Sequence, residues 1–166
     1  MGPLERLLIG KVEGYDLPKL QASGFRVTSC ENHAYNCIAW AVREETAWWE
    51  PTDESDDYRY WPDGVPAEQT IPAYVAAIRT KGFEVCEDGS LESGFEKIAL
   101  YADEYDIPKH AARQLASGAW TSKLGYLEDV EHPSVEDVAG EYYGEVVRYL
   151  KRAIPAPAPS EGSTLS

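Results

Sequence analysis

The second half of the chain contains four segments that are typical of antiparallel strands. They read FEKIALYADEYD, HAARQL, AWTSKLG and EVVRYLKR, and turn residues separate them, most clearly Ser117 and Gly118 between the second and the third. In the first half, apolar spacing predicts a short buried helix over residues 35–43, capped by Asn36, and a second helix in PAYVAAIRTKGF that ends at Gly82. We therefore expect an α+β domain in which a cysteine-bearing helix packs on an antiparallel sheet of about four to five strands.

The composition fits one folded domain followed by a short tail. A chain of 166 residues, of which 43% are hydrophobic, has enough apolar material for a core. Only the C-terminal stretch AIPAPAPSEGSTLS changes in composition, and its alternate prolines exclude a helix or a paired strand there. We predict a single domain over residues 8–152 and a disordered tail over residues 153–166.

The charge of the chain limits its partners and its location. Lys and Arg number 15 against 29 for Asp and Glu, which gives a net charge of −14. Such a chain is repelled by nucleic-acid phosphates and anionic lipids, so we expect neither nucleic acid nor membrane as a partner. The start of the chain lacks the pattern of a secretory signal, and three cysteines are an odd number for a disulfide framework. We expect free thiols and a cytoplasmic location, with export that needs no signal peptide left open.

Cys37 is the first candidate for chemistry because it lies near the start of the predicted helix over 35–43. Unpaired N–H groups and the helix dipole at that position are expected to lower the pKa of the thiol. A nucleophilic thiol needs a base within hydrogen-bond reach, and His110 opens the predicted strand HAARQL. Ser122 follows twelve residues later, on the next predicted strand, where its side chain is expected close to the imidazole.

This order of residues resembles that of papain-like cysteine hydrolases, and among them the compact NlpC/P60 and CHAP domains. YNCIAWA is similar to their cysteine helix, and HAARQLASGAWTSK is similar to their histidine strand, turn and third-residue strand. The set YNCIAWA, WWEP, YWP, FEKIALYA, HAARQL, WTSKLG and YYG also resembles a family of uncharacterised bacterial proteins known as a domain of unknown function.

The papain-like resemblance implies a papain-like fold with Cys37 as nucleophile and His110 as general base. The third position of those families is usually His, Asn, Gln, Asp or Glu. Here it falls on Ser122, which orients an imidazole weakly because its hydroxyl is neutral. The alternatives in the segment LGYLEDVEH are Glu128, Asp129 and His132. The oxyanion hole is expected to combine the Cys37 N–H with the side chain of Asn32 or Asn36.

An aromatic and acidic segment follows Cys37 closely in the sequence. We expect its aromatic side chains to line a substrate groove beside the thiol, namely Trp48, Trp49, Tyr60 and Trp61. The loop from Glu50 to Asp57 favours a basic peptide or an amine as the molecule bound there, if it borders the groove. Lys123, in the strand WTSKL, is interpreted as a surface charge.

Two functions are therefore open. The first is a cysteine-dependent hydrolase of the peptidase, amidase or thioesterase type. The second is a non-catalytic protein-interaction module whose acidic, aromatic-rich face binds a peptide or protein. We expect no cofactor and no metal. Cys30, His33 and Cys37 have zinc-like spacing, with His110, His132 or Cys86 as a fourth ligand, but the second closely spaced pair of a structural zinc site is missing.

Overall fold

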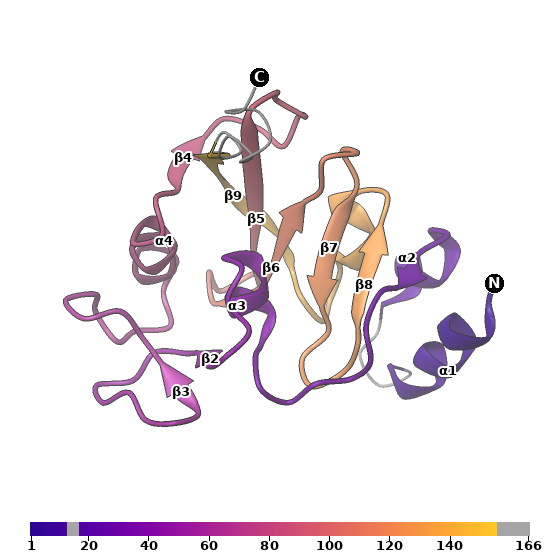
Figure 1. Cartoon of the computed structure of the whole chain (residues 1–166), viewed down its shortest axis with the longest axis horizontal. Helices are drawn as coiled ribbons and strands as arrows, with labels where there is room; N and C mark the ends of the chain where they lie inside the picture. Colours follow the sequence, from indigo (N-terminus) through magenta and orange to yellow (C-terminus); the bar gives the residue numbers. More distant parts are fainter. Residues whose placement is uncertain (13–16, 156–166) are drawn as a thin grey trace, which may run out of the picture.

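A seven-stranded antiparallel sheet dominates the structure, a computed structural model that describes residues 1–12 and 17–155. The strand order across the sheet is β1-β8-β7-β6-β5-β9-β4 (Figure 1). The strands are β1 (Arg26–Val27), β4 (Glu84–Cys86), β5 (Phe95–Ala102), β6 (Pro108–Gln114), β7 (Trp120–Lys123), β8 (Asp129–His132) and β9 (Glu145–Ala153). Two further strands, β2 (Trp48–Trp49) and β3 (Arg59–Tyr60), pair in parallel as a separate small sheet.

This architecture corrects the predicted fold. The papain-like arrangement of a helix on a sheet of four to five strands is wrong, because the described residues form a main sheet of seven strands, a separate two-stranded sheet and a few short helices. The four strands predicted in the second half correspond to β5, β6, β7 and β9. The segment GFEVCEDG, which also has the pattern of a short strand, forms β4, whereas β1 has only two residues, too few for a clear alternation of apolar and polar residues.

The helices lie on both faces of the sheet. They are α1 (Pro3–Lys11), α2 (Pro18–Ala22), α3 (Cys37–Ala41) and α4 (Ile71–Arg79), and a 3₁₀ helix spans Val135–Val138. In Figure 1, α3 lies in front of β6 with α4 to its left, and α1 and α2 lie at the other side, beyond β8. Asn36 caps α3 as predicted, since its side chain accepts a hydrogen bond from the Ala39 N–H.

Two hydrophobic cores result, one on each face, and β5 contributes to both. Ile98 and Leu100 pack with α3 and α4, whereas Ala99 and Tyr101 pack with α1 and α2. Successive side chains of a strand point to opposite faces, so this alternation follows directly from strand geometry. The consequence is that the central strands are buried on both faces, and neighbouring residues in them serve different cores.

The ends of the predicted domain are only partly described. Strand β9 continues to Ala153, and most of the predicted tail of residues 153–166 lies outside the described residues. Among the helices of residues 1–12 and 17–155, none combines the length and the apolar character needed to cross a membrane.

Candidate functional site

Cys37 and His110 lie on opposite faces of the sheet. On the face that carries α3, the Trp40 indole N–H donates to Thr121 Oγ1 at 3.0 Å, and the Arg113 guanidinium lies 5.0 Å from the centre of a Trp40 ring. His110 occupies the alternate register and packs on the other face, with its ring 5.3 Å from that of Tyr101. The structure therefore does not bring the thiol and the imidazole together.

His110, Ser122 and His132 do lie together, in the core on the face of the sheet that carries α1 and α2. Ser122 Oγ is 2.9 Å from His110 Nε2 and 2.8 Å from His132 Nε2. His132 Nδ1 is 2.8 Å from the carbonyl oxygen of Ser134, which can only accept, so we assign the proton to this nitrogen. His132 Nε2 then accepts from the Ser122 hydroxyl, and the same hydroxyl oxygen accepts from His110 Nε2–H.

This hydrogen-bonded chain is closed to solvent. His110, Ser122 and His132 are each 0% exposed, and the His110 ring stacks on Tyr143 at 4.1 Å between centroids. Burial and the nearby His132 lower the pKa of His110 to about 3, and burial also lowers the pKa of His132. Both imidazoles are therefore neutral at pH 7, and the two histidines are part of the packed core.

Cys37 lies at the start of α3 and lines a cavity of 380 Å³. Burial raises the pKa of the thiol above its ordinary value, although the backbone N–H groups of Ala111 and Ile38, and the charge of Lys123, act in the opposite direction. The expected lowering of this pKa is wrong, because the loss of hydration outweighs the favourable dipoles. The thiol is thus mostly protonated at pH 7.

Lys123 is not the surface charge that the sequence indicated. Its side chain is fully buried, and Nζ donates to the carbonyl oxygens of Gly125 at 2.6 Å and Leu127 at 2.5 Å. The ammonium also lies 5.2 Å from the centre of the Tyr35 ring. Two carbonyl acceptors and a ring face compensate for the burial of the charge, which explains why a lysine is tolerated there.

The remaining candidates for the third position and the oxyanion hole have other partners. Asp129 accepts from the Tyr35 hydroxyl at 3.0 Å, and Glu128 accepts from Lys11 Nζ at 2.6 Å. The Asn36 side chain accepts from the Trp49 N–H at 3.1 Å and donates to the Trp49 carbonyl at 2.8 Å, so it joins α3 to β2. Asn32 lies in an exposed turn, where it accepts from the Ala34 N–H at 2.8 Å.

The predicted aromatic groove forms in part. Trp48 and Trp49 line the cavity that contains Cys37. Tyr60 packs against Trp49 at 4.8 Å between ring centroids, and Trp61 is buried 5.2 Å from Tyr74. The first two therefore face the cavity, and the other two support its wall.

A second cavity of 650 Å³ adjoins the first, since Trp48 and Glu50 line both. The sequence analysis did not single out Tyr126, which reaches this cavity from the turn between β7 and β8 and packs on Trp48 at 4.5 Å between centroids. Tyr58 and His33 complete the aromatic part of the lining. We call the two cavities together the Trp48 groove.

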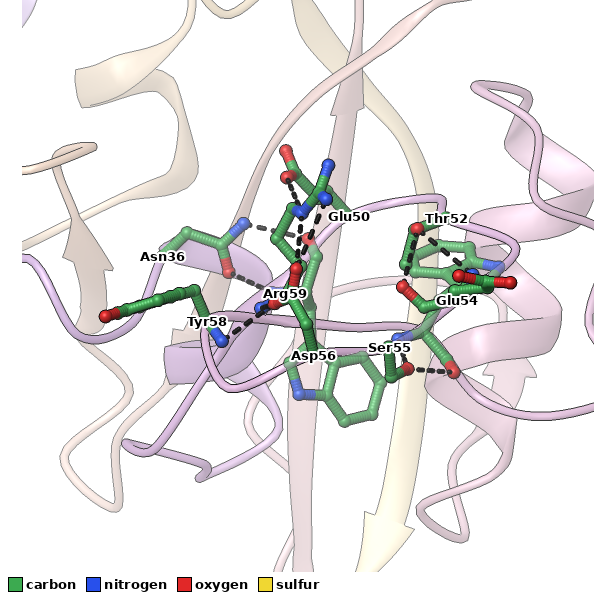
Figure 2. A network of polar contacts seen from close by, with 10 residues as sticks. Asn36, Glu50, Thr52, Glu54, Ser55, Asp56, Tyr58 and Arg59 are labelled. Carbon is green, nitrogen blue, oxygen red and sulfur yellow. Dashed lines mark hydrogen bonds and ion pairs between the residues drawn. The ribbon is translucent and has the colours of Figure 1, made fainter.

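The acidic loop borders this groove and is held in place by its own polar contacts (Figure 2). Asp56 accepts from the backbone N–H groups of Tyr58 and Arg59 at 2.8 and 2.7 Å, and these bonds lower the pKa of its carboxyl group. The Arg59 guanidinium lies 3.2 Å from Asp56 and 3.8 Å from Glu50. The carboxylates therefore have defined positions at the edge of the groove.

The residues with zinc-like spacing do not form a metal site. Cys30 is exposed, His33 packs against Tyr126 at 5.2 Å between centroids, and Cys37 lines the first cavity. In the part of the chain that the structure describes, no group of three or more His, Cys, Asp or Glu side chains is placed to hold a metal ion.

Comparison with known families assigns the chain to one of them. Residues 26–151 match the family described as "Domain of unknown function (DUF7689)". The match begins in β1 and ends in β9, so it includes all seven strands of the main sheet. The chain belongs to this family, which confirms the resemblance to a domain of unknown function. No curated protein and no solved structure matches the chain.

Proposed function

We propose that this chain is a protein-interaction module that binds a positively charged peptide segment in the Trp48 groove. The observation that carries the proposal is the composition of the groove, in which aromatic walls and carboxylates occur together. Aromatic side chains supply large, rigid contact areas, and peptide-binding surfaces are enriched in them. The two adjoining cavities provide room for several consecutive residues of an extended peptide.

Charge supports a cationic ligand. The net charge of the chain is −14, and the loop from Glu50 to Asp57 places acidic side chains at the groove. The cationic groups at the groove are paired, Arg59 with Asp56 and Lys109 with Asp103 at 3.7 Å. Complementary charge of this kind speeds association and selects among partners, and salt weakens both effects.

A cysteine-dependent hydrolase remains the second candidate, and one observation favours it. Cys37 lines a cavity, and the backbone N–H groups of Ala111 and Ile38 act to lower the pKa of its thiol. A thiolate or an acyl oxygen is stabilised by such groups. The hydrolase ranks second because His110 lies across the sheet and burial raises the pKa of the thiol.

Calorimetric titration tests the proposed binding function. Three ten-residue peptides with the same Gly-Ser spacing but four lysines, four glutamates or four serines are titrated into the full chain. We expect binding of the lysine peptide alone, and weakening as the salt concentration rises from about 0.05 M to about 0.5 M. Glu50→Gln is expected to weaken binding several-fold, and Glu87→Gln, at an exposed site after β4, serves as the matched control. Equal affinity for all three peptides contradicts the proposal.

Alkylation by iodoacetamide between pH 4 and pH 9 tests the second candidate. Exposed Cys30 serves as the internal reference. The binding function predicts slow labelling of Cys37 at neutral pH, because its thiol is protonated and partly buried. Selective labelling of Cys37 with an apparent pKa below about 7 favours the hydrolase instead.

A further inference from the structure

The second cavity of the Trp48 groove has the features of a site for a single organic cation. His33, Trp48, Tyr58 and Tyr126 supply aromatic rings, and Glu50 and Asp57 supply carboxylates. Tyr58 is 78% exposed and Tyr126 is 54% exposed. Large aromatic side chains are usually buried in the core, where burial stabilises the fold. Several of them exposed together at an open cavity are therefore typical of a binding surface.

Contacts between the rings fix their orientation. The Trp48 indole N–H donates to the His33 carbonyl oxygen at 2.6 Å, and Trp48 and Tyr126 lie 4.5 Å apart with their planes inclined by 36°. His33 meets Tyr126 edge to face, at 5.2 Å and 67°. The Trp48, Tyr126 and His33 rings are therefore inclined to one another where they line the cavity, an arrangement that we call the aromatic corner.

This corner suits an ammonium group better than a guanidinium group. A guanidinium is planar and needs a flat ring face together with a carboxylate in fork geometry, whereas an ammonium is a compact charge that rings at different angles can contact at once. The nearby Asp56 carboxylate already accepts hydrogen bonds from a guanidinium, because Arg59 Nη2 and Nε donate to it at 3.2 and 3.4 Å. Arg59 also lines this cavity and lies 3.8 Å from Glu50, so Asp57 adds the negative charge that a desolvated ammonium requires, and Glu50 is shared with Arg59.

We infer that this aromatic corner is the subsite for a lysine side chain of the bound segment. The inference rests on the proposed binding function and adds that the groove prefers lysine to arginine. The ammonium lies against the exposed part of the Tyr126 ring beside Trp48, with Asp57 as its carboxylate partner and Glu50, which Arg59 also contacts, close by. The first cavity, which contains Cys37, then receives the neighbouring residues of the peptide.

The test compares the four-lysine peptide with a four-arginine peptide of the same spacing and charge. Because the net charge is equal, a difference in affinity reports the shape of the subsite and not general attraction. We expect the full chain to bind the lysine peptide several-fold more tightly. Tyr126→Leu keeps an apolar side chain but removes the ring face. It is expected to weaken lysine-peptide binding by about threefold to thirtyfold and to remove the preference over arginine.

Tyr105→Leu is the matched control, because Tyr105 is 76% exposed in the turn between β5 and β6 and lines neither cavity of the groove. The lysine assignment is overturned if Tyr126→Leu binds the lysine peptide like the wild type, or if the wild type prefers arginine. In either case sensitivity to Glu50→Gln still supports the binding function. Failure of both basic peptides to bind refutes the binding function itself.

Discussion

Ser122→Ala tests the hydrogen-bonded chain of His110, Ser122 and His132 in the core on the face of the sheet that carries α1 and α2. The Ser122 hydroxyl joins two buried imidazoles, donating to His132 Nε2 at 2.8 Å and accepting from His110 Nε2–H at 2.9 Å. Alanine fits the space but supplies neither a donor nor an acceptor. Both ring nitrogens then lose their partner in a place that is 0% exposed.

The magnitude follows from these two losses. A buried polar group left without its hydrogen bond costs about 1–3 kcal/mol, so two of them imply a loss of about 2–6 kcal/mol in the free energy of unfolding. Against a typical total of about 5–15 kcal/mol this is a large effect. Urea denaturation followed by tryptophan fluorescence measures it, and Ser90→Ala, at an exposed site, is the control.

A loss below about 0.5 kcal/mol for Ser122→Ala, similar to that of an ordinary surface substitution, refutes the assigned hydrogen-bonded chain. A second readout is the slow exchange of the His110 Nε2 proton in NMR spectra. The assignment predicts a protected signal in the wild type that is lost in the variant.

The remaining predictions concern pH, one ion pair and the environment of the thiol. The pKa of His110 is about 3 when folded and about 6.5 when unfolded, so the unfolded state binds more protons below pH 6.5. Stability should therefore fall by up to about 1.4 kcal/mol per pH unit between pH 6 and pH 4, and His110→Phe should flatten this slope in urea titrations. Glu96→Gln should cost about 1.5–3 kcal/mol, measured by urea denaturation, because buried Glu96 accepts a charged hydrogen bond from Arg152 Nε at 3.0 Å. Lys123→Met removes a positive charge near the thiol, so alkylation should report a higher apparent pKa for Cys37, and an unchanged value would contradict the assigned influence.

Much of the strand content was predictable, but the face on which each side chain lies was not. The strand that contains His110 begins at Pro108, and its residues from His110 to Gln114 are all buried. Where both faces of a strand are covered, no alternation of apolar and polar residues marks the two sides. The sequence therefore could not separate His110 from Cys37, and a shift of one residue decides the outcome.

The groove shows a similar limit. Trp48 and Trp49 were predictable because they follow Cys37 closely and belong to an aromatic segment. Tyr126 comes from the turn between β7 and β8, and only the pairing of those strands brings it to Trp48. The burial of Lys123 also depends on distant backbone folding, since the Gly125 and Leu127 carbonyls become its acceptors only when this turn forms.

The most direct test of the central claim follows the indole N–H signals of the five tryptophans during titration with the four-lysine peptide. Trp48 lines both cavities of the groove, whereas Trp120 is buried in the core on the opposite face of the sheet. The account predicts that the Trp48 signal moves and saturates while the Trp120 signal stays in place. Binding that leaves the Trp48 signal unchanged would show that the peptide is held elsewhere, which contradicts the account.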